Sequence, residues 1–310
     1  QVFSLRALGP DWSFLCTWAI ILGYIGVVAF EACALPTVLE YIAPDFLRGY
    51  MYTVEGFDIY ATWVAVGVIS SLIITYVNYI GIKPAAFLQG ILTAVIIAIG
   101  LVLIAGSSVS GKLTYTEPLF NDGFGGILSV AVMTPFMFVG FDVIPQAAEE
   151  IAIPFKDIGK LIILSIGSAV VWYAVIILSV SVMMTAPEID SSVLVKADAI
   201  KKAYGGSELM AKLLIIGGMA GIVSSWNSFF MGGSRAIYAL AKARCLPEFL
   251  SVLHPRYKTP TNAIILTGAI SCIEPFFGRA MMVWLTNAGG TGAVTAYLMV
   301  SISFLVLRRK

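Results

Sequence analysis

Residues 125–151 read GGILSVAVMTPFMFVGFDVIPQAAEEI, and this stretch decides how the chain must fold. Its first thirteen residues have the composition of half a membrane span, but Asp142 and Pro145 follow closely. An aspartate at the centre of a membrane helix costs about 2.5 to 3.5 kcal/mol. A proline removes a backbone donor and clashes with the carbonyl four residues earlier, that of Phe141. Because Gly140 adds backbone freedom, we predict that the helix breaks between Gly140 and Pro145.

A helix break inside a membrane is tolerated only where protein or water covers the exposed backbone. Transporters place broken helices at their substrate sites, where the free amides of a half-helix present a positive end to anionic groups. We therefore interpret the segment from Gly140 to Pro145 as part of a substrate pocket. The alternative is that Asp142 lies near the end of the span, beside Glu149 and Glu150, and caps the helix before a loop.

The composition of the chain is that of a membrane protein. Of its 310 residues, 59% are hydrophobic and 12% are charged, whereas soluble domains have about 45 to 50% apolar and about 25% charged residues. A membrane helix needs about 20 apolar residues, and an open sheet cannot satisfy its backbone in lipid. We predict an all-α, polytopic fold with eight membrane helices. Their expected ranges are 13–43, 59–80, 84–106, 125–152, 159–185, 209–244, 261–277 and 280–305.

The chemically reactive residues argue against several other classes of protein. A net charge of +1 without a dense basic patch argues against a nucleic-acid partner. The chain has one histidine, four dispersed cysteines without a CxxC pair, and no HExxH motif, which argues against a metal site and against a membrane enzyme. A channel would show a repeated pore-lining motif, and the sequence has none. We therefore expect no catalytic residue, no metal and no cofactor.

The distribution of basic residues predicts the orientation, because short cytoplasmic loops carry an excess of Lys and Arg. If residue 1 lies inside, twelve of the nineteen Lys and Arg residues fall on that side and seven on the other. We predict an integral, multi-pass protein of the plasma membrane with both ends of the chain in the cytoplasm. On the outer side, residues 191–203 have the pattern of a short amphipathic helix that can act as a lid.

Three blocks of the sequence resemble the amino acid/polyamine/organocation superfamily of permeases. FVGFDVIPQAAEEIAIPFKDIGKLI (138–162) resembles the sixth membrane segment of that family and the loop after it. SSWNSFFMGGSRAIYALAKARCLPEFLSVLHPRYKTPTNAI (224–264) resembles the eighth segment and the basic loop into the ninth, and YVNYIGIKPAAFLQGILT (76–93) resembles the connection between the fourth and fifth. The order and spacing of the three blocks across most of the chain make the resemblance specific.

The resemblance implies a LeuT-type fold, built from two inverted repeats of five helices each. The eight predicted helices then correspond to segments three to ten, and the chain is interpreted as a fragment that lacks the broken first helix of the pocket. Within one partial membrane domain, 1–310, the resemblance places the remnant of the first repeat at 1–106 and the second repeat at 125–305. Similar lengths of 13–106 and 209–305 favour this repeat without reference to the family.

The resemblance also implies where a substrate is bound. In the sixth segment the family contacts its substrate on either side of the break, at the positions of Phe136, Met137, Val139, Gly140, Phe141 and Asp142. The aromatic ring of Phe136 is expected to close over the ligand, and the exposed main chain is expected to meet its amino group. Ordinary packing of Phe136 against lipid or core is the alternative.

Two further groups are candidates for coupling transport to an ion. Ser224, Ser225 and Asn227 lie on the segment where sodium-coupled relatives bind their ion, although small hydroxyl residues also form packing seams between membrane helices. Glu31 shares a helix face with Tyr24 and can carry a proton. Alternatively, Glu31 reaches water by snorkelling.

The expected function is secondary active transport of amino acids or related amines by alternating access, as proton-coupled symport or as exchange. A proton is favoured over sodium as the coupling ion, and the lipid bilayer and a small-molecule substrate are the expected partners. Two departures from the family pattern weigh against proton coupling and against a cationic substrate. Ile96 stands where many members have a charge-carrying lysine, and Gly23 stands where an acidic residue often precedes the tyrosine. The alternative is a nutrient sensor that uses the same fold without transport.

Overall fold

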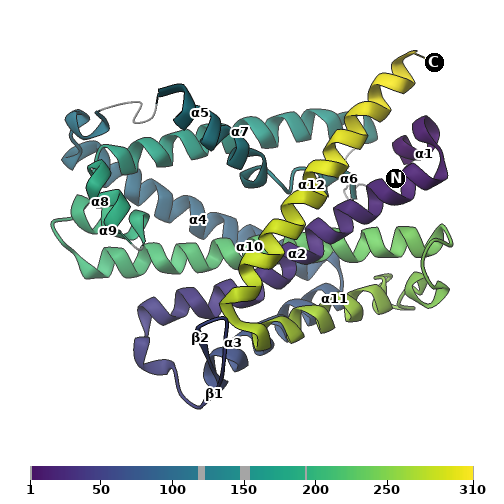
Figure 1. Ribbon diagram of the computed structural model, residues 1–310, viewed down its shortest axis with the longest axis horizontal. Helices are drawn as coiled ribbons and strands as arrows, with labels where there is room; N and C mark the ends of the chain where they lie inside the picture. The colour runs from purple at the N-terminus through teal and green to yellow at the C-terminus, as the bar shows by residue number, and fades with distance from the viewer. Residues whose placement is uncertain (1, 118–122, 147–153, 193, 310) are drawn as a thin grey trace. The chain divides into compact units, whose positions relative to one another are not determined.

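The computed structural model describes residues 2–117, 123–146, 154–192 and 194–309. Helices dominate this part of the chain, which confirms the predicted all-α, polytopic class (Figure 1). The elements in chain order are α1 (Val2–Leu8), α2 (Pro10–Ile42), η1 (Pro44–Phe46), β1 (Tyr50–Val54), β2 (Phe57–Tyr60), α3 (Ala61–Tyr79), α4 (Ile82–Ser110), η2 (Leu113–Thr116), α5 (Gly123–Met137), α6 (Val143–Gln146), α7 (Phe155–Ser181), α8 (Ala186–Ser191), α9 (Val195–Ala203), α10 (Glu208–Lys242), η4 (Glu248–Ser251), α11 (Thr261–Ile273), η5 (Glu274–Phe277) and α12 (Gly278–Arg309).

Seven helical stretches in the described residues are long and apolar enough to cross a membrane. They are Pro10–Ile42, Ala61–Tyr79, Lys83–Ser110, Lys156–Ser181, Glu208–Lys242, Thr261–Met282 and Ala288–Arg309. The remaining predicted span, 125–152, begins as α5 and is interrupted, and its residues 147–152 lie outside the described part. The chain is therefore an integral, multi-pass membrane protein.

The chain divides into two compact units that do not follow the expected repeat boundaries. Unit 1 comprises residues 1–89, 142–152 and 222–310, and unit 2 comprises 90–141 and 153–221. Each unit draws on both halves of the sequence. The inverted repeats expected at 1–106 and 125–305 remain a prediction, because grouping by packing does not test internal symmetry.

In unit 1, α2 and α12 lie side by side (Figure 1), and glycines allow their close approach. A Cβ atom on Gly23 would lie 3.4 Å from the carbonyl oxygen of Gly289, and one on Gly292 would lie 2.6 Å from that of Ala19. Small residues at a membrane helix interface let backbones pack closely. This packing gives a structural reason for the glycine at position 23, where the family resemblance led us to look for an acid.

A β-hairpin follows α2 where we expected only a loop and the start of a helix at residue 59. Strands β1 and β2 pair antiparallel, and α3 begins at Ala61. The two-residue turn is Glu55 and Gly56, with φ angles of 48° and 80°. Positive φ at both positions is typical of the type I′ turn, whose twist matches that of the paired strands. Aromatic residues in both strands on either side of Glu55 and Gly56 were the sequence signal for this hairpin.

Unit 2 has an apolar core built around Leu103, Ile176 and Ile200 from α4, α7 and α9. Helix α9 begins at Val195, so the predicted amphipathic helix at 191–203 is shorter at its start. Bulky rings pack against glycines of α4, since a Cβ on Gly100 would lie 2.4 Å from the Trp172 ring.

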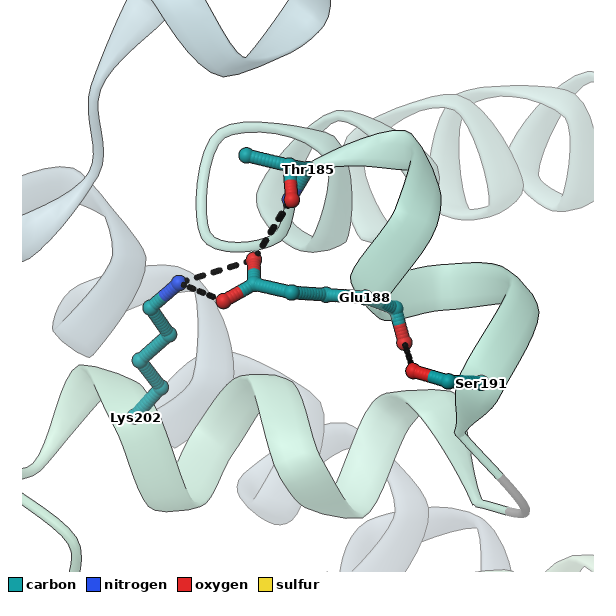
Figure 2. Close-up of polar contacts among 4 residues, drawn as sticks. All are labelled: Thr185, Glu188, Ser191 and Lys202. Carbon is teal, nitrogen blue, oxygen red and sulfur yellow. Dashed lines mark hydrogen bonds and ion pairs between the residues drawn. The ribbon is translucent and has the colours of Figure 1, made fainter.

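The short helices of unit 2 are joined by one carboxylate, that of Glu188 (Figure 2). Glu188 accepts hydrogen bonds from the amide and hydroxyl of Thr185, at 2.7 and 3.0 Å, and so forms a capping box at the start of α8. Nζ of Lys202 in α9 lies 2.8 and 2.9 Å from its two oxygens. These contacts, first the Lys202 hydrogen bond and then those of Thr185, lower the pKa of Glu188 to about 2.

Candidate functional site

The helix that begins at Gly123 ends at Met137, and residues 138–142 form a turn before the short helix α6. Gly140 has a φ of 123°, a conformation that residues with a side chain rarely adopt. Pro145 is the third residue of α6 and follows the interruption. In the first turn of a helix the missing proline N–H costs little, because that donor has no intrahelical partner. The interruption therefore depends on the glycine, and the proline is accommodated in the half-helix after it.

Asp142 closes the interrupted segment and is held by two tyrosines. The hydroxyl of Tyr24 in α2 donates to Oδ2 of Asp142, and the hydroxyl of Tyr297 in α12 donates to Oδ1 at 2.9 Å. Tyr24 is fully buried, and Asp142 itself is half-buried. A carboxylate with both oxygens bonded to hydroxyls needs no solvent to satisfy it. Asp142 thus joins three segments of unit 1, which differs from the alternative of a helix cap before a loop.

The expected substrate contacts surround this turn. Phe136 and Met137 are the last two residues of α5, and their side chains lie outside what the structure describes. Val139, Gly140 and Phe141 belong to the turn and are half-buried. Their peptide groups are not part of a continuous helix.

Glu31 lies two turns after Tyr24 on α2 and is also buried, with 7% of its surface exposed. Its side chain is hydrogen-bonded with that of Ser225 in α10. The burial is inconsistent with the snorkelling alternative, in which the carboxylate reaches water. The structure brings Glu31 and Ser225 together, although the two residues were singled out from separate parts of the sequence.

Asn227 lies at the centre of a second polar network, which the sequence did not reveal. Its Oδ1 accepts from Asn78 at 3.0 Å, and its Nδ2 donates to the Ala85 carbonyl at 3.2 Å and to Gln89 at 3.4 Å. Gln89 in turn donates to the hydroxyl of Ser224 at 2.5 Å. The network links α3, α4 and α10 in unit 1. The fully buried Asn227 is therefore satisfied by protein groups.

Tyr297, Asn78 and Gln89 are the residues that sequence reasoning missed. Tyr297 stands in an apolar stretch, TAYLMV, with no motif or charge to mark it. Asn78 and Gln89 stand inside a block that was quoted for its resemblance but not for its polar side chains. A polar residue in an otherwise apolar span was the available signal, because such residues face protein and bond across helices.

In the part of the chain that the structure describes, no three His, Cys, Asp or Glu side chains are grouped closely enough to hold a metal ion. Ile96, at the position of the family's lysine, lies in the part of α4 that belongs to unit 2 and is half-buried.

The comparisons with known proteins agree on one class of protein, that of transporters. The family model described as amino acid permease matches residues 1–310. The branched-chain amino acid permease BcaP of Bacillus subtilis (strain 168) is 27% identical over 325 residues, which cover 99% of this chain and 66% of that protein. The methylthioribose transporter of the same organism is 24% identical over 318 residues, with 99% and 66% covered. Cationic amino acid transporter 3, mitochondrial, of Arabidopsis thaliana is 26% identical over 318 residues, with 99% and 51% covered. The chain thus spans about half to two thirds of the length of these relatives.

Proposed function

Because this chain belongs to the amino acid permease family, whose members are transporters and not enzymes, we propose that the whole protein transports amino acids or related amines across the membrane by alternating access. The observation that carries the proposal is the interrupted segment 138–142 in a chain of membrane helices. A break of this kind exposes peptide groups only where a ligand, water or protein covers them.

Within the proposal, the substrate is bound by the interrupted segment through Phe136, Met137, Val139, Gly140, Phe141 and Asp142. The turn and the start of α6 offer both peptide N–H and C=O groups outside a continuous helix, and a zwitterion carries a carboxylate for the first and an ammonium group for the second. Asp142 already accepts two tyrosine hydroxyls. Its part in the proposal is to hold the turn open and to set the local charge.

We propose that substrate transport is coupled to protons by symport, or that the protein exchanges one substrate for another. Glu31 is the candidate proton carrier because it is buried in α2 and bonded to Ser225. A charged carboxylate is costly to bury. Binding a proton to Glu31 therefore stabilises the conformation in which its side chain is buried, and releasing the proton destabilises that conformation. Sodium at Ser224 and Asn227 is less favoured, because Oδ1 of Asn227, the atom that would ligate an ion, accepts from Asn78.

The proposed setting is the plasma membrane with both ends of the chain in the cytoplasm, as the basic residues favour. We also propose that 1–106 is the remnant of one inverted repeat and that 125–305 is the second. The hairpin after α2 and the helices α8 and α9 then lie on the outer side.

The test is uptake into proteoliposomes that contain the whole protein. The substrate panel is leucine, isoleucine, lysine, arginine and methylthioribose, each measured with and without a pH gradient. Replacing Phe136 by Ala should abolish uptake of the preferred substrate. Phe124→Ala is the matched control, because Phe124 is on the same helix and 74% exposed, and it should leave uptake unchanged. Saturable ligand binding without uptake would support the sensor alternative and overturn the proposal.

A further inference from the structure

A pocket of about 220 Å³ lies in unit 1 at the end of α2, and none of its lining residues belongs to the interrupted segment. It is formed by α2, the hairpin, the start of α3 and the start of α12. The lining residues that matter for its chemistry are Glu40, Asp58, Tyr60, Trp63, Gly278 and Arg279.

The shape of the pocket is fixed by its floor and by the attachment of the hairpin. Trp63 and Ile59 are buried, with 4% and 2% of their surfaces exposed. Gly278 has a φ of 68°, and a Cβ atom there would lie 2.2 Å from Cδ1 of Ile59. The hydroxyl of Tyr52 in β1 donates to the Phe276 carbonyl at 2.7 Å and fastens the hairpin to η5. Contacts within the protein therefore hold the walls of the pocket in place.

The charges of the pocket leave one carboxylate unbalanced. Arg279 and Glu40 form an ion pair across the pocket, and both are about one third exposed. Asp58 is a second carboxylate, and its Oδ1 accepts from the Thr53 hydroxyl at 2.7 Å. Among the described residues no Lys, Arg or His is paired with Asp58. With two acids and one base the lining favours a cation, and aromatic faces add to the attraction of an organic one.

The volume selects a small ligand. Pockets for drug-sized molecules start at about 300 Å³. A molecule of amino-acid size, with a single positively charged group and an apolar body, fits both the volume and the lining.

We propose that this pocket binds small primary ammonium compounds, with Asp58 and Glu40 receiving the ammonium group and the rings of Tyr60 and Trp63 facing the apolar body. The site shares no residue with the interrupted segment and does not rest on the proposed transport function. Free amino acids and amines without a carboxylate both carry the required group. Arg279 is the residue that can distinguish them, because it can meet a carboxylate if Glu40 turns to the ammonium.

The test is calorimetric titration of the whole protein in lipid nanodiscs with three probes of one shape. Leucinamide carries the ammonium alone, leucine carries both charges, and 4-methylpentanoate carries the carboxylate alone. At pH 6 the amines are protonated, because α-amino groups titrate at about 7.7 to 8.0. Asp58→Asn keeps the acceptor for Thr53 but removes the charge, and should weaken leucinamide binding about tenfold, the loss of one charge-assisted bond.

Glu55→Gln is the matched control, because Glu55 is an acid of the same hairpin outside the pocket lining; it should bind leucinamide as the parent protein does. If leucinamide binding persists in Asp142→Asn but weakens in Asp58→Asn, the ligand binds in this pocket and not at the proposed transport site. Leucine binding that depends on Asp58 in the same way supports the proposal equally. Equal affinity of the parent and Asp58→Asn for leucinamide would overturn it, as would binding of 4-methylpentanoate as tight as that of leucinamide.

Discussion

The hydroxyl of Tyr24 offers a direct measure of how strongly the interrupted segment is anchored. In Tyr24→Phe the ring and its packing remain, and the hydrogen bond to Asp142 is lost. Hydrogen bonds to charged groups contribute roughly 1.5 to 3 kcal/mol. Tyr24 is fully buried, so water cannot replace the hydroxyl. Because Tyr297 still donates to the other oxygen, at 2.9 Å, we expect a loss of about 2 kcal/mol and no global unfolding.

The assay is thermal unfolding in detergent, followed by the fluorescence of tryptophan. A loss of about 2 kcal/mol lowers the midpoint by roughly 4 to 8 °C for a folded unit of about 150 to 250 residues. In an Asp142→Asn background, Tyr24→Phe should lower the free energy of unfolding by at least about 1 kcal/mol less, because the charge that strengthens the hydrogen bond is absent. This coupling energy lies within the range of roughly 0.5 to 3 kcal/mol measured for residues in contact. Tyr76→Phe is the matched control, because Tyr76 lies on a membrane helix and is 64% exposed; its midpoint should not change.

Equal destabilisation by Tyr24→Phe in the parent and in Asp142→Asn would show that the two side chains are not coupled. The anchoring of the turn by α2 would then be wrong, even if the helix is interrupted at the same residues. A drop in the Tyr76→Phe midpoint of the same size would instead show that the assay reports removal of any tyrosine hydroxyl.

Two further outcomes follow from the packing and the charges. Gly292→Ala should lower the free energy of unfolding by about 1 to 3 kcal/mol, measured by thermal unfolding, because the new Cβ would lie 2.6 Å from the carbonyl oxygen of Ala19. Gly218→Ala is the control: no atom lies within 4 Å of its Cβ, so it should be neutral or stabilising. The pKa of Glu188 is lowered from 4.5 to about 2, so its contribution to stability is complete above pH 4.5 and lost as the pH falls towards 2. The protection factors of the α8 and α9 amides, in which the intrinsic pH dependence of exchange is divided out, should therefore fall over that window. Glu188→Gln should remove this dependence on pH, and an unchanged profile of protection factors in that variant would contradict the assignment.

The sequence by itself determined the class and the family. Apolar stretches of membrane length set an all-α, polytopic fold, because a backbone in lipid can satisfy itself only within such elements. The order of Gly140, Asp142 and Pro145 indicated where a membrane helix cannot run on. These conclusions rest on local rules: hydropathy over about 20 residues, and the backbone limits of glycine and proline.

Tertiary structure alone decided which side chains meet. Asp142 and Tyr297 are 155 residues apart, as are many other pairs of polar residues in the chain, and nothing in either local sequence selects the partner. The resemblance predicts an acidic residue at position 23, and only the packing of α12 against Gly23 explains why a glycine stands there. The pocket with Asp58 likewise needs the hairpin and α12 together. Such contacts depend on how helices pack in three dimensions, which hydropathy does not encode because the faces of a membrane helix that meet lipid and those that meet protein are both largely apolar.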